Sequence, residues 1–124
     1  MHPTELSDQD IAAYVNDGHW TSETIVDRYC AYAKSFPDTI ACHDKDDSYT
    51  WRELDAITDR VAAYLIGLKI ERDARAMVQI PTSTKEIVLR IAFKKAGIIA
   101  AFAPMQWRRL ELADVLNRLE PNLL

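Results

Sequence analysis

The sequence has 124 residues, of which 48% are hydrophobic and 27% are charged, and this balance is typical of one small globular domain rather than of a disordered chain. The formal net charge of −4 at pH 7 argues against a nucleic-acid or anionic-membrane surface, because such partners select clustered Lys and Arg. No apolar run is long enough to span a bilayer, and residues 1–8 lack the charged-then-apolar order of a signal peptide, so we expect a cytoplasmic protein.

Two helices are predicted at the N-terminal end, over residues 7–17 and 22–36. The hydroxyl of Thr21 or Ser22 can cap the second helix, and Pro37 ends it. Its apolar side chains recur on one stripe: Ile25, Tyr29, Tyr32, Ala33 and Phe36. This stripe indicates a helix with one face directed toward other parts of the protein.

A small β-hairpin is predicted next, with strands over residues 39–43 and 48–50 and an acidic turn over residues 44–47. The hairpin leads directly into a helix, because Thr50 and Glu53 have the spacing of a Thr-x-x-Glu capping box. Apolar residues then recur at helical spacing until the helix ends near residues 67–69: Leu54, Ile57, Val61, Tyr64, Leu65 and Leu68.

A second strand and helix pair is predicted over residues 75–80 and 85–96. Pro81 ends the strand, and Ser83 with Glu86 makes a Ser-x-x-Glu capping box that begins the helix. Core-facing positions of this helix are Ile87, Val88, Ile91 and Ala92. Near its end, positive charge suits the helix dipole and glycine suits the C-cap, at Lys94, Lys95 and Gly97.

The remaining elements repeat the pattern. Residues 98–103 are nearly all apolar, as expected for a strand that is covered on both faces. Residues 108–119 predict a helix whose inward side chains are Leu112, Val115, Leu116 and Leu119. Residues 121–124 have the pattern of the beginning of another strand, so we expect the chain to be the front of a larger protein.

The alternation of strands and helices with short connections predicts an α/β fold with parallel pairing and right-handed crossovers. We expect a partial doubly wound parallel sheet flanked by helices, preceded by an N-terminal helical arm and the small hairpin. Residues 1–37 form the arm in this interpretation, and residues 38–124 form an incomplete α/β subdomain. Ligands of such sheets bind at the carboxyl ends of the strands where the winding reverses.

Local motifs for catalysis or metal binding are scarce in this sequence. Glycine occurs only three times, and residues 82–85 imitate a phosphate loop with hydroxyls and a lysine but no glycine, so helix capping explains them better. Cys30 and Cys42 form no Cys-x-x-Cys pair, and we expect both to be buried thiols. The histidines have no ligand spacing, and His43 is expected at the surface rather than in catalysis.

Six short motifs occur in sequence from residue 18 onward: Gly18-x-Trp20 with Glu23-Thr24, Phe36-Pro37-Asp38-x-x-Ala41, Tyr49-Thr50-Trp51-x-Glu53-Leu54-Asp55, Gln79-Ile80-Pro81, Lys95-Ala96-Gly97, and Trp107-Arg108-Arg109-x-Glu111-Leu112. In this order and spacing they resemble adenylate-forming enzymes, the superfamily of acyl-CoA and aryl-CoA synthetases, luciferases and peptide-synthetase adenylation domains. The opening over residues 20–24 is most similar to the branch that activates aryl acids such as dihydroxybenzoate.

The resemblance implies a large ligase that joins a small carboxylic acid to ATP and then transfers the acyl group to a thiol, usually coenzyme A. ATP, Mg²⁺ and coenzyme A are the expected cofactors and substrates of the full-length family. The family's phosphate loop, Mg²⁺ residues, hinge and catalytic lysine correspond to positions beyond Leu124, so no catalytic residue and no cofactor are assigned to this chain alone. The expected partner is the remainder of the ligase, in the same or a separate chain.

Two arginines are the candidate binding residues. Arg108 and Arg109 lie at a helix start, where free N–H groups attract anions, and in relatives a basic residue near this position lies close to a phosphate of coenzyme A. The alternative is that they are solvated and balance Glu111 and Asp114. For the whole chain, too, two classes remain: the N-terminal fragment of an acid-CoA ligase, inactive alone, or a stand-alone binding or regulatory module that reuses this piece of the fold.

Overall fold

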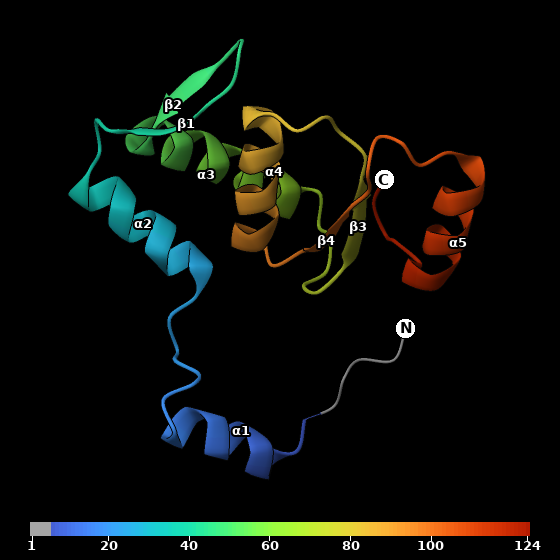
Figure 1. Cartoon of the computed structure of the whole chain (residues 1–124), viewed down its shortest axis with the longest axis horizontal. Helices are drawn as coiled ribbons and strands as arrows, with labels where there is room; N and C mark the ends of the chain where they lie inside the picture. Colours follow the sequence, from blue (N-terminus) through green and yellow to red (C-terminus); the bar gives the residue numbers. More distant parts are fainter. Residues whose placement is uncertain (1–5) are drawn as a thin grey trace.

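The structure is a computed structural model that describes residues 6–124, so the first five residues of the predicted arm, His2 included, lie outside the described residues. Its elements follow in chain order (Figure 1): α1 (Asp8–Asn16), α2 (Ile25–Ser35), β1 (Ile40–His43), β2 (Ser48–Thr50), α3 (Trp51–Gly67), β3 (Arg75–Val78), α4 (Thr84–Lys95), β4 (Ile99–Phe102) and α5 (Arg109–Leu119). Every predicted helix and strand is present, with ends that differ by a few residues.

The two N-terminal helices relate differently to the rest of the molecule. Figure 1 shows α1 set apart from the other elements, and none of its residues is buried. Helix α2 begins at Ile25 rather than at the predicted residue 22, because Thr24 and Asp27 cap its end reciprocally. The ring of Tyr32 stacks on Trp51 of α3 at 5.1 Å between centroids, so α2 packs onto the α/β unit. A domain boundary at residue 37 remains a prediction.

The hairpin and α3 form as predicted. Strands β1 and β2 pair antiparallel, and the Thr50–Glu53 capping box begins α3 immediately afterwards. Tyr64 and Leu68 have the same helical spacing as the buried Leu54 and Leu65 but are 67% and 46% exposed. They border an open hollow beside β3, where no further element covers the end of α3 within residues 6–124.

The central sheet is parallel and its winding reverses at β3. Strand β4 pairs with β3 in parallel, and Leu123 makes a parallel bridge to Ala76 of β3. The amide of Met77 donates to the carbonyl of Leu123, whereas β4 bonds to the alternate residues of β3, so the strand begun at Leu123 lies on the opposite edge of β3. Two successive crossovers from this sheet therefore run in opposite directions, which confirms a partial doubly wound sheet.

Helices cover both faces of this sheet, as a doubly wound fold requires. Helices α4 and α5 lie on opposite sides of β3 and β4 (Figure 1). One core cluster joins α3, α4 and one sheet face, and its buried members are Leu65, Ala76, Ala92, Phe93 and Ile98. A second cluster joins α5 to the other face, and its buried members are Met77, Ala103 and Leu119.

Three burial predictions need correction. Strand β4 has helices on both faces but is less buried than expected: Ile99 is 49% exposed and the rest of the strand is half-buried, because β4 is an edge strand with β3 as its only strand neighbour in the described part of the chain. Ile87 was assigned to the core but is 37% exposed, since it lies beside the buried stripe of α4 rather than on it. Cys30 and Cys42 are free thiols that are half-buried rather than buried.

Candidate functional site

The carboxyl ends of β3 and β4 lie at one edge of the sheet, where doubly wound folds bind their ligands. The chain leaves β3 through residues 79–83 and leaves β4 through residues 103–108. The amide of Gln79 joins these two loops, because its Nε2 donates to the carbonyls of Pro104 at 2.9 Å and Trp107 at 3.2 Å. The two loops therefore form one connected edge.

A hollow of about 310 Å³ opens at this edge. It is lined by Ile80, Thr82, Glu86, Arg90, Phe102, Ala103, Pro104, Met105 and Gln106. The positively charged side chain in this lining is Arg90. Its Nε and Nη2 donate to Oε1 of Glu86 at 2.8 and 2.6 Å, and its guanidinium lies 3.9 Å from the centroid of the Phe102 ring. Because a guanidinium has five N–H donors, this pairing leaves donors for an anionic or carbonyl group.

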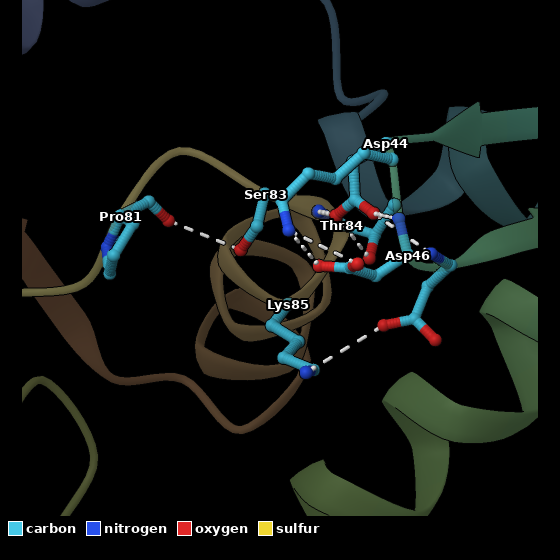
Figure 2. A network of polar contacts seen from close by, with 8 residues as sticks. Asp44, Asp46, Pro81, Ser83, Thr84 and Lys85 are labelled. Carbon is cyan, nitrogen blue, oxygen red and sulfur yellow. Dashed lines mark hydrogen bonds and ion pairs between the residues drawn. The ribbon is translucent and has the colours of Figure 1, made fainter.

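The N-terminus of α4, which borders this edge, is capped from another part of the chain (Figure 2). Oδ2 of Asp44, in the β1–β2 turn, accepts from the backbone N–H of Thr84 at 2.8 Å and from its hydroxyl at 3.0 Å. Oδ1 of the same carboxylate accepts from the backbone N–H groups of Asp46 and Asp47, each at 2.8 Å. The hydrogen bond from the Thr84 backbone, followed by those from Asp47 and Asp46, holds the pKa of Asp44 far below its ordinary value.

The predicted Ser83–Glu86 capping box is therefore wrong. Ser83 occupies the N-cap position, but its hydroxyl donates to the carbonyl of Pro81 at 3.1 Å and makes no capping bond. Glu86 turns to Arg90 instead of to the helix end. Sequence reasoning missed Asp44 because the turn and the helix are 40 residues apart, and no local pattern indicates that they meet.

Arg108 and Arg109 lie at the start of α5, on the same carboxyl edge as the hollow, and both are exposed. The carboxylate of Glu111 accepts from its own backbone N–H and from that of Arg108 at 3.0 Å, and these two contacts, in that order, lower the pKa of Glu111. The Arg108 guanidinium donates to the carbonyl of Met105 at 3.1 Å, while Asp114 pairs with Arg118 rather than with either arginine. Their assignment to coenzyme A remains a prediction.

A second charged cluster lies away from this edge, between α3 and α4. Nζ of Lys95 is 2.6 Å from both Oδ1 of Asp55 and Oδ1 of Asp59, and its side chain is only 8% exposed. The Sγ atom of Cys30 on α2 is 3.9 Å from the same oxygen of Asp55. This cluster joins three helices and lines no sizeable cavity, so its role is structural.

Residues 6–124 contain no metal-binding cluster and no membrane-spanning helix. No group of three or more His, Cys, Asp or Glu side chains that could hold a metal ion occurs in this range. None of the helices in the same range combines the length and apolar character that crossing a membrane requires.

Parallel strands, helices on both faces and a reversal beside β3 define the class of this protein as a doubly wound α/β fold with its candidate site at the carboxyl edge. Residues 30–124 match the family described as AMP-binding enzyme, and the chain belongs to that family. Over 119 residues the chain is 30% identical to a medium-chain fatty-acid–CoA ligase of Escherichia coli, covering 95% of the chain and 21% of the relative.

Aryl-acid enzymes also match. The chain is 31% identical over 106 residues to a salicyl-AMP ligase of Mycobacterium tuberculosis, covering 82% of the chain and 19% of the relative. It is 30% identical over 110 residues to a 2,3-dihydroxybenzoate-AMP ligase of Bacillus subtilis, covering 89% of the chain and 20% of the relative. The chain thus spans about a fifth of the length of these curated relatives.

Solved structures contain the same arrangement of elements. The apo structure of Mycobacterium smegmatis MbtA superimposes with a TM-score of 0.88 at 28% identity, over 97% of this chain and 23% of that one. The N-terminal subdomain of Klebsiella oxytoca NpsA superimposes with a TM-score of 0.77 at 19% identity, over 82% of this chain and 27% of that one. The fold is therefore that of the N-terminal portion of adenylate-forming enzymes, as the sequence resemblance implied.

Proposed function

We propose that this chain is the N-terminal portion of an ATP-dependent acid–thiol ligase, which forms an acyl-adenylate from a carboxylic acid and then passes the acyl group to a thiol. The observation that carries the proposal is the match to acid ligases along 95% of the chain. The doubly wound reversal at β3 supports it, because this is where the carboxyl edge becomes a ligand crevice. ATP and coenzyme A are cytoplasmic metabolites, so the predicted cytoplasmic location belongs to the same proposal.

The described residues do not fit ATP or Mg²⁺. They contain no cluster of metal-ligating side chains, and the sequence has no glycine-rich loop in which backbone N–H groups could surround a phosphate. We therefore assign the adenylation step to the remainder of the ligase, in the same chain or a separate one. This portion contributes the sheet edge, its hollow and the start of α5.

An aryl acid is the proposed substrate class. The opening motif over residues 20–24 and the named aryl-acid relatives support it, while the fatty-acid ligase among the relatives makes an aliphatic acid the competing choice. The division into an arm, residues 1–37, and an α/β subdomain, residues 38–124, is part of the same proposal.

ATP–pyrophosphate exchange tests the function directly. We expect no exchange from the chain as given, and acid-dependent exchange from the protein extended by its downstream coding sequence, strongest with salicylate or dihydroxybenzoate and weaker with octanoate. The extended protein without acid is the control. Exchange by the 124-residue chain alone would contradict the assignment, and an inactive extended protein beside a monodisperse chain would favour the stand-alone module.

The role of the two arginines at α5 is testable in the extended ligase. If Arg108 and Arg109 bind a phosphate of coenzyme A, replacing both with Ala raises the KM for coenzyme A roughly thirtyfold, since each lost charge-assisted contact is worth about 1 kcal/mol, and leaves the KM for ATP unchanged. Arg118→Ala at the far end of α5 is the matched control, because that side chain pairs with Asp114. An unchanged KM for coenzyme A refutes the role.

A further inference from the structure

Helix α1 and the turn that follows it make a small unit with an apolar face. The side chains of Ile11, Tyr14 and Val15 are spaced along one side of the helix, and the ring of Trp20 stacks on that of Tyr14 at 5.0 Å between centroids. The backbone N–H of Trp20 donates to the carbonyl of Tyr14 at 3.0 Å, so the turn folds back onto the helix. We call Ile11, Tyr14, Val15 and Trp20 the α1 face.

No other helix or strand within residues 6–124 covers the α1 face. Its four residues are 39% to 52% exposed, every residue from 6 to 25 is exposed, and Figure 1 shows α1 apart from the sheet and its helices. Isolated helices shorter than about 12–15 residues are marginal in water, and α1 has nine. Its Ser7–Asp10 capping box helps, but helices owe most of their stability to a packed apolar face. The α1 face therefore needs a partner outside these residues.

The comparison with MbtA indicates where such a partner lies. The match extends over 97% of this chain, so it includes α1, but over only 23% of MbtA. A helix placed like α1 thus occurs in a protein whose larger part lies outside the match. That larger part is available to cover the α1 face.

The charge around the α1 face limits the chemistry of the partner. Residues 6–24 contain no Lys or Arg, and their four acidic residues are Asp8, Asp10, Asp17 and Glu23. Of these, only Glu23 pairs with a cation within the described residues, that of Arg28. An acidic border disfavours an anionic membrane surface and suits a protein surface that carries basic side chains.

We propose that the α1 face docks on the remainder of the ligase, against an apolar patch bordered by Lys or Arg side chains. The identity of the partner rests on the proposed function, because it assumes that an acid–thiol ligase continues beyond these residues. The face that is exposed in residues 6–124 is then buried in the extended protein, and packing there holds α1 in place.

Amide hydrogen exchange followed by mass spectrometry tests the docking. We expect residues 9–20 to exchange roughly hundredfold more slowly in the ligase extended by its downstream coding sequence than in the 124-residue chain, because a docked helix exchanges only when it leaves its partner. Helix α4, with its buried stripe, is the internal control and exchanges slowly in both proteins. Equal exchange of α1 in the two proteins overturns the proposal.

Other occupants of the α1 face give different results in the 124-residue chain. Slow exchange of residues 9–20 that appears only at high chain concentration identifies a second copy as the occupant. Slow exchange that appears only with added phosphatidylcholine vesicles identifies a membrane. Either result overturns docking on the remainder of the ligase.

A double variant, Ile11→Ser with Val15→Ser, tests which side of α1 docks. Serine has nearly the helix propensity of Ile and Val, so the variant removes apolar contact without weakening the helix itself. In the extended ligase, exchange of residues 9–20 is expected to rise to within about threefold of the rate in the 124-residue chain. In the 124-residue chain the variant leaves the melting temperature unchanged, because both side chains are exposed there.

Ala13→Ser is the matched control for the double variant. Ala13 lies on the opposite side of α1, and its replacement lowers helix propensity more than the double variant does at either position. Exchange of residues 9–20 in the extended ligase should nevertheless stay within about twofold of the native rate. Retained protection in the double variant, or an equal loss in Ala13→Ser, overturns the proposal.

The basic border of the partner has its own test. Raising NaCl from about 50 to about 500 mM is expected to speed α1 exchange roughly threefold in the extended ligase and to leave it unchanged in the 124-residue chain, because salt screens opposite charges. Salt-independent exchange in the extended ligase overturns the basic border. An extended ligase that protects α1 but lacks ATP–pyrophosphate exchange counts against the proposed function alone, and an active one with unprotected α1 counts against the docking alone.

Discussion

Replacing Ile91 with Ala is expected to lower the free energy of unfolding by about 3 kcal/mol, a large part of the 5–15 kcal/mol that typically stabilises a domain. Ile91 is only 2% exposed and forms the centre of a cluster with Leu54 and Val88. Truncation removes buried methyl groups and leaves a cavity between α3 and α4 that the surrounding helices cannot fill. Urea unfolding followed by circular dichroism measures the loss as a lower midpoint at an unchanged slope.

Two control variants separate the cost of a buried cavity from the cost of any truncation in α4. Ile91→Val removes one methyl group and should cost about 1 kcal/mol. Ile87→Ala makes the same chemical change on the same helix at a side chain that is 37% exposed, and should cost less than about 1 kcal/mol. Similar losses for Ile87→Ala and Ile91→Ala would show that the cluster between α3 and α4 is not the main source of stability.

Replacing Lys95 with Met is expected to cost about 2 kcal/mol, because Asp55 and Asp59 would lose the ammonium that lies 2.6 Å from each. The loss is smaller than the 3–5 kcal/mol typical of breaking a fully buried pair. Asp59 is 65% exposed, so water replaces much of the lost interaction there. Chemical unfolding of the variant against the native chain measures the difference.

Lys94→Met is the matched control for this prediction. Both lysines lie in the last turn of α4, so both interact equally with the helix dipole, but Lys94 is exposed. The dipole alone predicts equal losses of a few tenths of a kcal/mol for the two variants, whereas the ion pairs predict a loss for Lys95→Met only. Equal losses would contradict the structural role of the cluster.

The pH dependence of the Lys95→Met effect has a definite sign. Burial works to lower the pKa of Lys95, but hydrogen bonds to Asp55 and Asp59 outweigh it and raise the pKa above its ordinary value. A raised folded-state pKa contributes stability that is fully present below the unfolded value of about 10.5 and is lost as pH rises through the folded value. The stability difference between native and variant chains should be constant from about pH 7 to 9 and shrink above about pH 10.5.

The order of helices and strands could be predicted from the sequence because its signals are local. A capping box joins residues three positions apart, as Thr50 and Glu53 do, so the beginning of α3 needs no information from elsewhere. Strands separated by a single helix with short loops can hardly pair except in parallel, which is the arrangement of β3 and β4. The same reasoning placed a further strand at residues 121–124, where Leu123 bridges to β3.

Burial could be predicted only in part. Helical spacing identifies which face of a helix is apolar, but it does not show how far along the helix other elements cover that face. Leu54, Val61 and Leu65 of α3 lie in or against core clusters, as expected. Tyr64 and Leu68 continue the same stripe but extend past the elements that could cover them. The N-terminus of α2 was placed too early in the sequence. Thr21, Ser22 and Thr24 all offer a hydroxyl that could cap the helix, but only Thr24 has a carboxylate, that of Asp27, three positions later.

The candidate site was located by its place in the fold rather than by its residues. The carboxyl edge of the sheet follows from strand order, and Arg108 and Arg109 do lie there. Asp44, Gln79 and Arg90, which organise the edge, were not identified from the sequence. Each acts on a partner from another element, such as the Thr84 amide or the Phe102 ring, and their sequence neighbours give no sign of these contacts.

The sequence by itself determined the α/β class, the succession of elements and the family, because caps, hydrophobic periods and short motifs all act within a few residues. Only the tertiary structure decided that Asp44 accepts from the first N–H of α4 and that Glu86 pairs with Arg90 instead of capping the helix. The physical reason is that the distance from Asp44 to Thr84 is set by the packing of the hairpin beside α4, although the two residues are 40 positions apart in the sequence. A contact between residues so far apart in the sequence depends on their positions in space, which local sequence patterns do not contain.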